Sequence, residues 1–152
     1  MIISDATKSD YEKLIGLWER SVRATHDFLD ESDIDYLRPL IIEQYFDAVK
    51  LKCAKDSHDN ILGFCGVADG NLEMLFVDPQ SMKQGVGTAL CRYAIENLTV
   101  TKVAVNEQNP QALGFYEHIG FHVIARSDLD GQGKPFPLLF MELKDNSIYT
   151  RL

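Results

Sequence analysis

The spacing of apolar residues predicts two helical regions near the start of the chain. Residues 8–23 carry apolar side chains three and four positions apart, which is the pattern of a helix with one buried face. A second helical region spans 30–47, and Pro39 is expected to divide it because proline suits the first turn of a helix and not its middle. A short strand is expected at 2–3, ahead of both.

The remainder of the chain predicts three strands in succession and then strand–helix units. Apolar runs between polar or glycine-containing turns predict strands at 49–55, 61–68 and 72–77. Helical spacing returns at 86–97 and 110–119, and further strands are expected at 101–106, 121–125 and 138–143. This order is typical of an α/β (α+β) domain whose mixed central sheet is flanked by helices. We expect a single domain, 1–144, followed by a tail, 145–152.

Composition narrows the classes of function. The chain has 152 residues and a formal net charge of −8, because 23 acidic residues outnumber 15 basic ones. A nucleic-acid-binding protein normally has a basic face, so this class is disfavoured, whereas a cationic or amine substrate is compatible with the charge. The apolar runs are far shorter than the ~20 residues of a membrane span, and the N-terminus lacks the pattern of a signal peptide. We therefore expect a cytoplasmic protein that binds neither nucleic acid nor membrane.

The three cysteines do not predict a disulfide framework or a metal site. Cys53, Cys65 and Cys91 are odd in number and lie far apart, whereas structural disulfides and zinc sites use closely spaced pairs. We therefore expect reduced thiols in the core and no bound metal.

Two glycines, Gly85 and Gly87, lead directly into the helix expected at 86–97. A helix start leaves about four backbone N–H groups without partners and carries the positive end of the helix dipole. Glycines allow a phosphate to approach this backbone, so the segment is a candidate anion site without side-chain charge. A strand–turn–helix corner whose glycines serve close packing explains the same spacing. The phosphate motifs of dinucleotide folds and ATPases have other spacings and do not match.

Two blocks of sequence together resemble the GNAT acetyltransferase superfamily. Residues 82–87, Met-Lys-Gln-Gly-Val-Gly, are similar to its acetyl-CoA motif, Gln/Arg-x-x-Gly-x-Gly/Ala. Residues 109–121 are similar to its second block, Asn-x-x-Ala-x-x-Phe-Tyr-x-x-x-Gly-Phe. The likeness covers 49–143, and the stretches 21–29 and 133–138 further resemble a YjaB-like bacterial subgroup.

The resemblance implies a sheet whose fourth and fifth strands splay apart to admit acetyl-CoA as a co-substrate. The fourth strand would bond the pantetheine arm through its main chain, and the glycine segment would hold the pyrophosphate. Met82 replaces the usual Gln or Arg of the motif, which removes a side-chain contact but keeps the backbone. The implied cofactor-binding residues are Leu75, Phe76, Val77, Met82, Lys83, Gln84, Gly85, Val86, Gly87, Thr88, Asn109 and Phe115. A helix cap is an equally good role for Asn109.

The resemblance places the general acid at Tyr116. When an amine attacks a thioester, the departing thiolate needs a proton donor, and a phenol with a pKa near ~10 stays protonated at neutral pH. Without the motif, a half-buried aromatic residue on an amphipathic helix is the ordinary explanation of this tyrosine.

The general base has two main candidates, and Glu107, next to the expected strand splay, is a weaker one. Glu73 is a carboxylate within an otherwise apolar strand, and several relatives use an acid on this strand; an exposed residue at the sheet edge is the alternative. His26 can accept a proton near neutral pH. Together with Asp27 it lies between the first helices, a region that borders the acceptor pocket in this fold. A solvated helix end explains these two residues equally well.

These residues and the resemblance predict an N-acetyltransferase that moves an acetyl group from acetyl-CoA to a primary amine by direct attack in a ternary complex. The acceptor is expected to be a protein lysine, with a small-molecule amine as the alternative. A non-catalytic acyl-CoA-binding module is the alternative from another class, and Met82 is the feature that favours it. The protein is expected to be a monomer or a homodimer.

Overall fold

A computed structural model of the chain describes residues 1–144, so the tail expected at 145–152 lies outside the described residues. Its elements, in chain order, are β1 (Ile2–Asp5), the 3-10 turn η1 (Lys8–Asp10), α1 (Tyr11–Thr25), α2 (Glu31–Leu40), the π-helical turn η2 (Ile41–Tyr45), β2 (Lys50–Lys55), β3 (Ile61–Ala68), β4 (Asn71–Val77), the 3-10 turn η3 (Pro79–Ser81), α3 (Val86–Asn97), β5 (Lys102–Asn106), α4 (Pro110–Ile119), β6 (Phe121–Ser127) and β7 (Leu138–Leu143).

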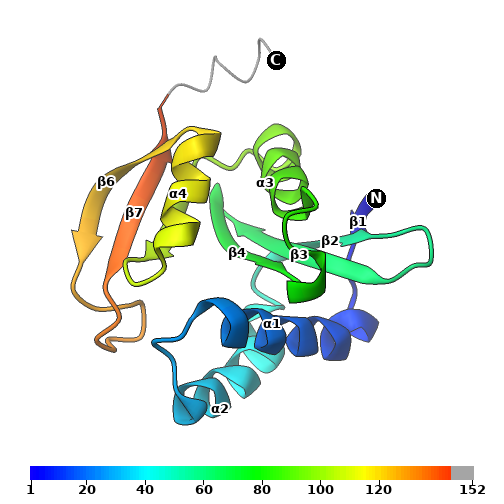
Figure 1. Cartoon of the computed structure of the whole chain (residues 1–152), viewed down its shortest axis with the longest axis horizontal. Helices are drawn as coiled ribbons and strands as arrows, with labels where there is room; N and C mark the ends of the chain where they lie inside the picture. Colours follow the sequence, from blue (N-terminus) through cyan, green and yellow to red (C-terminus); the bar gives the residue numbers. More distant parts are fainter. Residues whose placement is uncertain (145–152) are drawn as a thin grey trace.

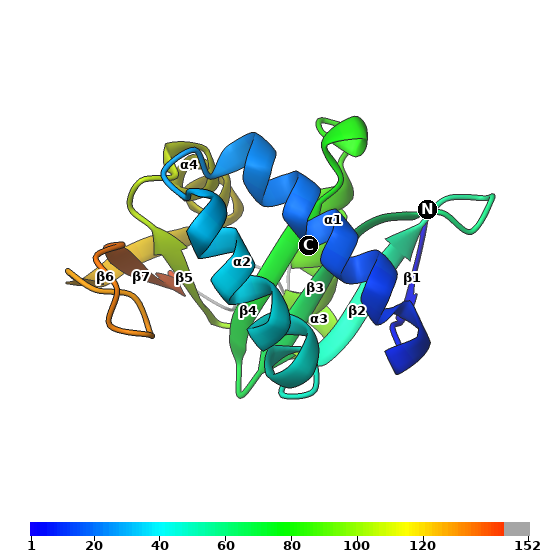
Figure 2. The same ribbon diagram turned by 90° about the horizontal axis from the view of Figure 1, so that it is seen from below.

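The strands of residues 1–144 form one mixed sheet in the order β1-β2-β3-β4-β5-β7-β6. β4 and β5 pair in parallel, and the other neighbouring pairs in the described part of the chain are antiparallel. Helices α1 and α2 cover one face of the sheet, whereas α3 and α4 lie on the other (Figures 1 and 2). The predicted fold class, the flanking helices and the predicted order of elements are therefore confirmed.

A separate core fills each face of the sheet. On one face, Leu90 of α3 packs in a cluster with Cys65 of β3. On the other face, Leu17 and Trp18 of α1 pack in a cluster with Phe64 of β3. Neighbouring residues of β3 thus enter different cores, because successive side chains of a strand point to opposite faces. This explains why the segment reads as a continuous apolar run.

The predicted division of the second helical region at Pro39 is wrong. Pro39 lies inside the last turn of α2, and the chain continues from there into the π-helical turn η2. Proline lacks an N–H group and its ring crowds the carbonyl four residues earlier, so the regular hydrogen-bond ladder cannot continue unchanged. The next turn uses a wider bond, from the N–H of Phe46 to the carbonyl oxygen of Ile41 at 2.9 Å. Ile41 and Phe46 are buried in the same core cluster as residues of α1, and this packing holds the turn against α1.

Gly63 sets how closely α3 approaches the sheet. A Cβ atom built on Gly63 would lie 2.9 Å from Cγ1 of Val86 and 2.9 Å from the carbonyl oxygen of Phe76. Both distances are shorter than an ordinary contact in a close-packed interior. Since Val86 is the first residue of α3, the missing side chain at Gly63 allows the start of this helix to pack directly on β3 and β4.

Gly63→Ala is expected to lower the free energy of unfolding by about 1–3 kcal/mol, because the added methyl group overpacks the contact with Val86 and Phe76. Gly114→Ala is the matched control, since a Cβ atom at Gly114 of α4 meets no atom within 4 Å. Alanine favours a helix interior over glycine by up to about 1 kcal/mol, so this variant should be as stable as the wild type or more so. Urea unfolding measures both, and equal stabilities would contradict the role assigned to Gly63.

Candidate active site

Strands β4 and β5 pair only near their N-terminal ends. The last parallel pair within the described residues joins Leu72 to Val103. Beyond it, β4 stays paired with β3 as far as Val77, and β5 stays paired with β7 as far as Asn106. The two strands therefore diverge. Backbone groups of β4 beyond Leu72 that face this opening have no strand partner on that side, which leaves them available to a ligand.

A β-bulge at Glu73 accompanies the divergence. Leu72 pairs with Val67, and Met74 pairs with Gly66, so Glu73 is an extra residue without a partner in β3. A bulge bends its strand and changes which face the following side chains occupy. Accordingly, Leu72 packs in the core on the α3 side, whereas Met74 packs in the core on the α1 side.

The segment between β4 and α3 presents a row of unpaired backbone donors. Gly85 is the N-cap of α3 in a left-handed conformation, with φ +82°, and no side chain caps the helix. The N–H groups from Lys83 to Thr88 donate to no acceptor within residues 1–144. With the positive end of the helix dipole, these groups provide a site for an anion.

A cavity of about 280 Å³ joins the last turn of α1, the end of β4 and the starts of α3 and α4. Its walls are mainly apolar or neutral. The lining residues are Ser21, Thr25, His26, Leu75, Phe76, Val77, Ser81, Met82, Lys83, Gly85, Val86, Gly87, Thr88, Asn109, Gln111, Ala112, Phe115 and Tyr116. Most of the residues that the sequence analysis names for cofactor binding and catalysis therefore meet in one place.

Three of the named residues lie elsewhere. Gln84 lines a separate polar groove. Glu73 and Asp27 are exposed and do not line the cavity. Although Glu73 is exposed, partial loss of solvent around its carboxyl group, and secondly the charge of Asp69, raise its pKa from the ordinary value of 4.5. Glu73 nevertheless does not line the cavity that contains Tyr116.

Five lining residues are not predicted as site residues from the sequence: Ser21, Thr25, Ser81, Gln111 and Ala112. Gln111 and Ala112 lie inside the block 109–121, so the resemblance could have indicated their positions. Ser21 and Thr25 are four residues apart in α1, and this spacing brings two side chains to the same face of a helix.

Tyr116 is held by aromatic neighbours at the wall of the cavity. Its ring meets Phe115 and Phe121 edge to face, with centroid distances of 5.1 and 5.7 Å. Only 7% of the residue is exposed. Burial is the largest cause that raises the pKa of Tyr116 well above its ordinary value of 10, so the phenol is protonated throughout the physiological range.

His26 brings a titratable ring to the same cavity. It ends α1, and its backbone N–H donates to the carbonyl oxygen of Val22 at 2.7 Å. Burial lowers the pKa of His26 below its ordinary value of 6.5, and the neighbouring Asp27 opposes this shift. The imidazole is therefore neutral at pH 7 and can accept a proton.

Asn109 combines two roles. Its side-chain oxygen accepts a hydrogen bond from the N–H of Ala112 at 3.2 Å, which caps α4. The same residue lines the cavity. The cap therefore fixes the start of α4, and with it the position of Tyr116 in the second turn.

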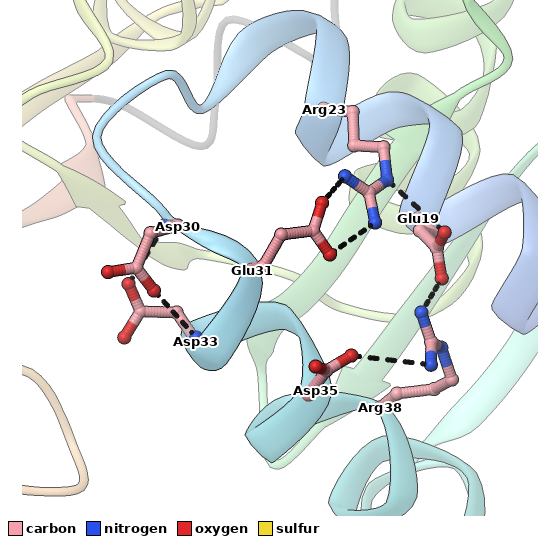
Figure 3. Close-up of polar contacts among 7 residues, drawn as sticks. All are labelled: Glu19, Arg23, Asp30, Glu31, Asp33, Asp35 and Arg38. Carbon is pink, nitrogen blue, oxygen red and sulfur yellow. Dashed lines mark hydrogen bonds and ion pairs between the residues drawn. The ribbon is translucent and has the colours of Figure 1, made fainter.

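Ion pairs between α1 and α2 hold the loop that begins at His26 (Figure 3). Glu19 accepts hydrogen bonds from Arg23 of its own helix and from Arg38 of α2. Arg23 also binds both carboxylate oxygens of Glu31 in the first turn of α2. The hydrogen bond from Arg38 is the main cause that lowers the pKa of Glu19, and the one from Arg23 lowers the pKa of Glu31. The network ties the two helices together on either side of the loop.

Comparison with known proteins decides the family. Residues 32–143 match the acetyltransferase (GNAT) domain. This chain belongs to the GNAT acetyltransferase family. One GNAT relative, the peptidyl-lysine N-acetyltransferase YjaB of Salmonella typhimurium, is 41% identical over 128 residues, which cover 84% of this chain and 88% of the relative. The resemblance proposed from the sequence is confirmed, and the protein is an N-acetyltransferase.

Solved GNAT structures agree with this assignment. The solution structure of apo-form YjaB from Escherichia coli is similar with a TM-score of 0.83 and 35% sequence identity, and the match covers 95% of this chain and 99% of that chain. The PaiA N-acetyltransferase of Thermoplasma acidophilum, solved in complex with coenzyme A, has the same fold with a TM-score of 0.73 and 20% identity, over 95% and 98% of the two chains.

The cysteines of this GNAT chain lie in its core. Cys53, Cys65 and Cys91 are free and buried. Burial raises the pKa of Cys65 and of Cys91 to about 12, so both remain thiols. Within residues 1–144, no group of three or more His, Cys, Asp or Glu side chains could hold a metal ion. Over the same residues, no helix combines the length and the apolar character that crossing a bilayer requires.

Proposed function

We propose that this GNAT enzyme transfers an acetyl group from acetyl-CoA to the side-chain amine of a protein lysine. One observation carries the proposal: a single cavity joins unpaired backbone donors at the start of α3, the buried phenol of Tyr116 and the neutral imidazole of His26. The name of the Salmonella relative, a peptidyl-lysine N-acetyltransferase, supports the acceptor class.

Acetyl-CoA fits these residues through backbone groups. The pyrophosphate would accept hydrogen bonds from the N–H groups of 83–88, where Gly85 and Gly87 present no side chain. The pantetheine amides would pair with main-chain groups of Leu75, Phe76 and Val77, beyond the point where β5 diverges from β4. These donors belong to the main chain, so a methionine at position 82 leaves them in place.

The chemistry requires one group that removes a proton and one that supplies a proton. His26 would take a proton from the lysine ammonium, and the free amine would attack the thioester carbonyl to give a tetrahedral intermediate. As the tetrahedral intermediate collapses and its C–S bond breaks, the phenol of Tyr116 would donate its proton to the leaving thiolate. The amide nitrogen would lose its second proton, which restores the phenol, and His26 would release its proton to solvent. No acyl-enzyme is needed, because the amine reaches the thioester directly.

Acceptor choice is tested by mixing the protein with acetyl-CoA and a panel of amines while free thiol is measured. Lysine-containing peptides are expected to give the highest kcat/KM, ahead of spermidine and free amino acids, and mass spectrometry should locate the acetyl group on the lysine side chain. A small amine that outperforms every peptide would contradict the lysine proposal. Saturable binding of coenzyme A without turnover on any amine would favour a non-catalytic binding module.

Tyr116→Phe is expected to lower kcat by about 100-fold, the smaller end of the range for loss of a general acid. The dissociation constant for coenzyme A should stay nearly unchanged, because the phenol acts on the leaving sulfur and not on the pyrophosphate. Stopped-flow kinetics and calorimetry separate the two quantities. Equal turnover by the wild type and the variant would remove Tyr116 from the acid role.

Gly85→Ala is expected to weaken coenzyme A binding by about tenfold, because alanine is strained by about 1–2 kcal/mol at φ +82° and the loop relaxes by turning its N–H groups away. Gly133→Ala is the matched control. Gly133 also has a positive φ, +77°, and free space around its Cα, but it lies in the β6–β7 loop and does not line the cavity. Calorimetric titration should distinguish the two variants, and equal affinities would count against the proposed phosphate site.

A further inference from the structure

The last turn of α1 contains a hydrogen-bonded chain that ends on His26. The hydroxyl of Thr25 donates to the carbonyl oxygen of Ser21 at 2.8 Å. The same hydroxyl oxygen lies 2.7 Å from Nδ1 of His26. All three residues line the cavity that contains Tyr116.

The two contacts together determine where the imidazole carries its proton. A threonine hydroxyl has one proton and two lone pairs. If that proton went to Nδ1, two oxygen atoms with lone pairs, those of Thr25 and Ser21, would face each other at 2.8 Å without a hydrogen between them. Both contacts are satisfied only when the hydroxyl donates to Ser21 and accepts from an Nδ1–H group of His26.

We propose that Thr25 is a positioning residue, which holds His26 in the tautomer protonated on Nδ1 so that Nε2 is the basic nitrogen facing the acceptor amine. This inference rests on the proposed function, in which His26 is the general base. It adds a residue to the catalytic arrangement without giving that residue any contact with the substrate.

The backbone around His26 supports a fixed ring. The N–H of His26 donates to Val22, and the carbonyl oxygen of His26 accepts from the N–H of Leu29 at 3.0 Å. The imidazole also packs against Phe28, with ring centroids 5.3 Å apart. The backbone bonds fix the main chain at His26, and Phe28 and the hydroxyl of Thr25 are the contacts of its ring. The bond to Thr25 also determines the tautomer of the ring.

The charges around His26 are few. Asp27, the next residue, favours the protonated ring, and burial outweighs it. Lys83 and Tyr116 line the same cavity from the segment before α3 and from α4, whereas β4 contributes only apolar side chains. On α1, the guanidinium of Arg23 is engaged by Glu19 and Glu31. The neutral form of His26 is thus the resting form at neutral pH, and its tautomer decides which nitrogen can act.

Nitrogen-15 NMR of the apo protein reads this tautomer directly. The wild type is expected to show His26 protonated on Nδ1, with Nε2 unprotonated. Thr25→Ser keeps the hydroxyl and should give the same signature, whereas Thr25→Val removes the acceptor and should shift the ring toward the tautomer protonated on Nε2. The wild-type spectrum decides the tautomer even if Thr25→Val does not fold.

Kinetics test the consequence. Thr25→Val is expected to lower kcat by about tenfold, a loss of the size found when the hydrogen-bond partner of a metal-ligating histidine is removed. Turnover should rise with pH through the pKa of His26, which lies below 6.5. This rise at acid pH is the acid limb of the pH profile. In Thr25→Val the protonated ring loses its hydrogen-bond acceptor, which lowers the pKa of His26, so the acid limb should move to lower pH. Thr25→Ser should recover most of the rate and the position of the limb.

The outcomes separate this inference from the proposed function. A wild type that turns over no amine would overturn the proposed function, and the role of Thr25 with it. An active wild type whose His26 is protonated on Nε2 would overturn the inference alone. An active Thr25→Val variant with an unchanged acid limb would also overturn the inference. A merely structural role for Thr25 would lower kcat without changing the tautomer of His26 or the position of the acid limb.

Discussion

The divergence of β4 from β5 after Leu72 is the constraint on which the site depends. Each strand keeps its other neighbour, so the opening costs the sheet only the pairing between these two. The bulge at Glu73 bends β4 at the point where the pairing stops. Helices α3 and α4 follow β4 and β5 in the chain, and their starts therefore line one cavity beside the opening. Beyond this point, the backbone groups of β4 that face β5 have no strand partner and are left for a ligand.

The sequence predicts this arrangement only in part. Periodicity locates the helices and strands, and Gly85 with Gly87 indicates the helix start that carries the donors. The bulge cannot be read from the sequence, because an extra residue in β4 is defined only by its register with β3. For this reason the apolar run 72–77 predicts one regular strand, and Glu73 is then expected in the cleft. The family resemblance predicts that Tyr116 lies beside the phosphate segment, whereas periodicity alone does not predict it.

The errors and omissions have physical causes as well. Pro39 has a strong local preference for a helix start, yet the burial of Ile41 and Phe46 carries the helix past it as a wider turn. The sequence does not predict a role for Thr25, because a threonine at the end of a helix is common and has no specific function by itself. Its meaning depends on the distances from its oxygen to Ser21 and to His26, and only the folded structure fixes these.

Burial acts in opposite directions on the two groups that the proposed chemistry needs. It lowers the pKa of His26, because the charged imidazolium is disfavoured away from water, and it raises the pKa of Tyr116, because the phenolate is disfavoured in the same way. Both groups therefore rest in their neutral forms between the two pKa values, which is the pair of protonation states that a base and an acid require. Lys83 is the one lining residue of the described cavity with a permanent charge. A chain with a net charge of −8 can thus hold a pyrophosphate on neutral backbone donors and leave the acid–base pair unperturbed by strong local fields.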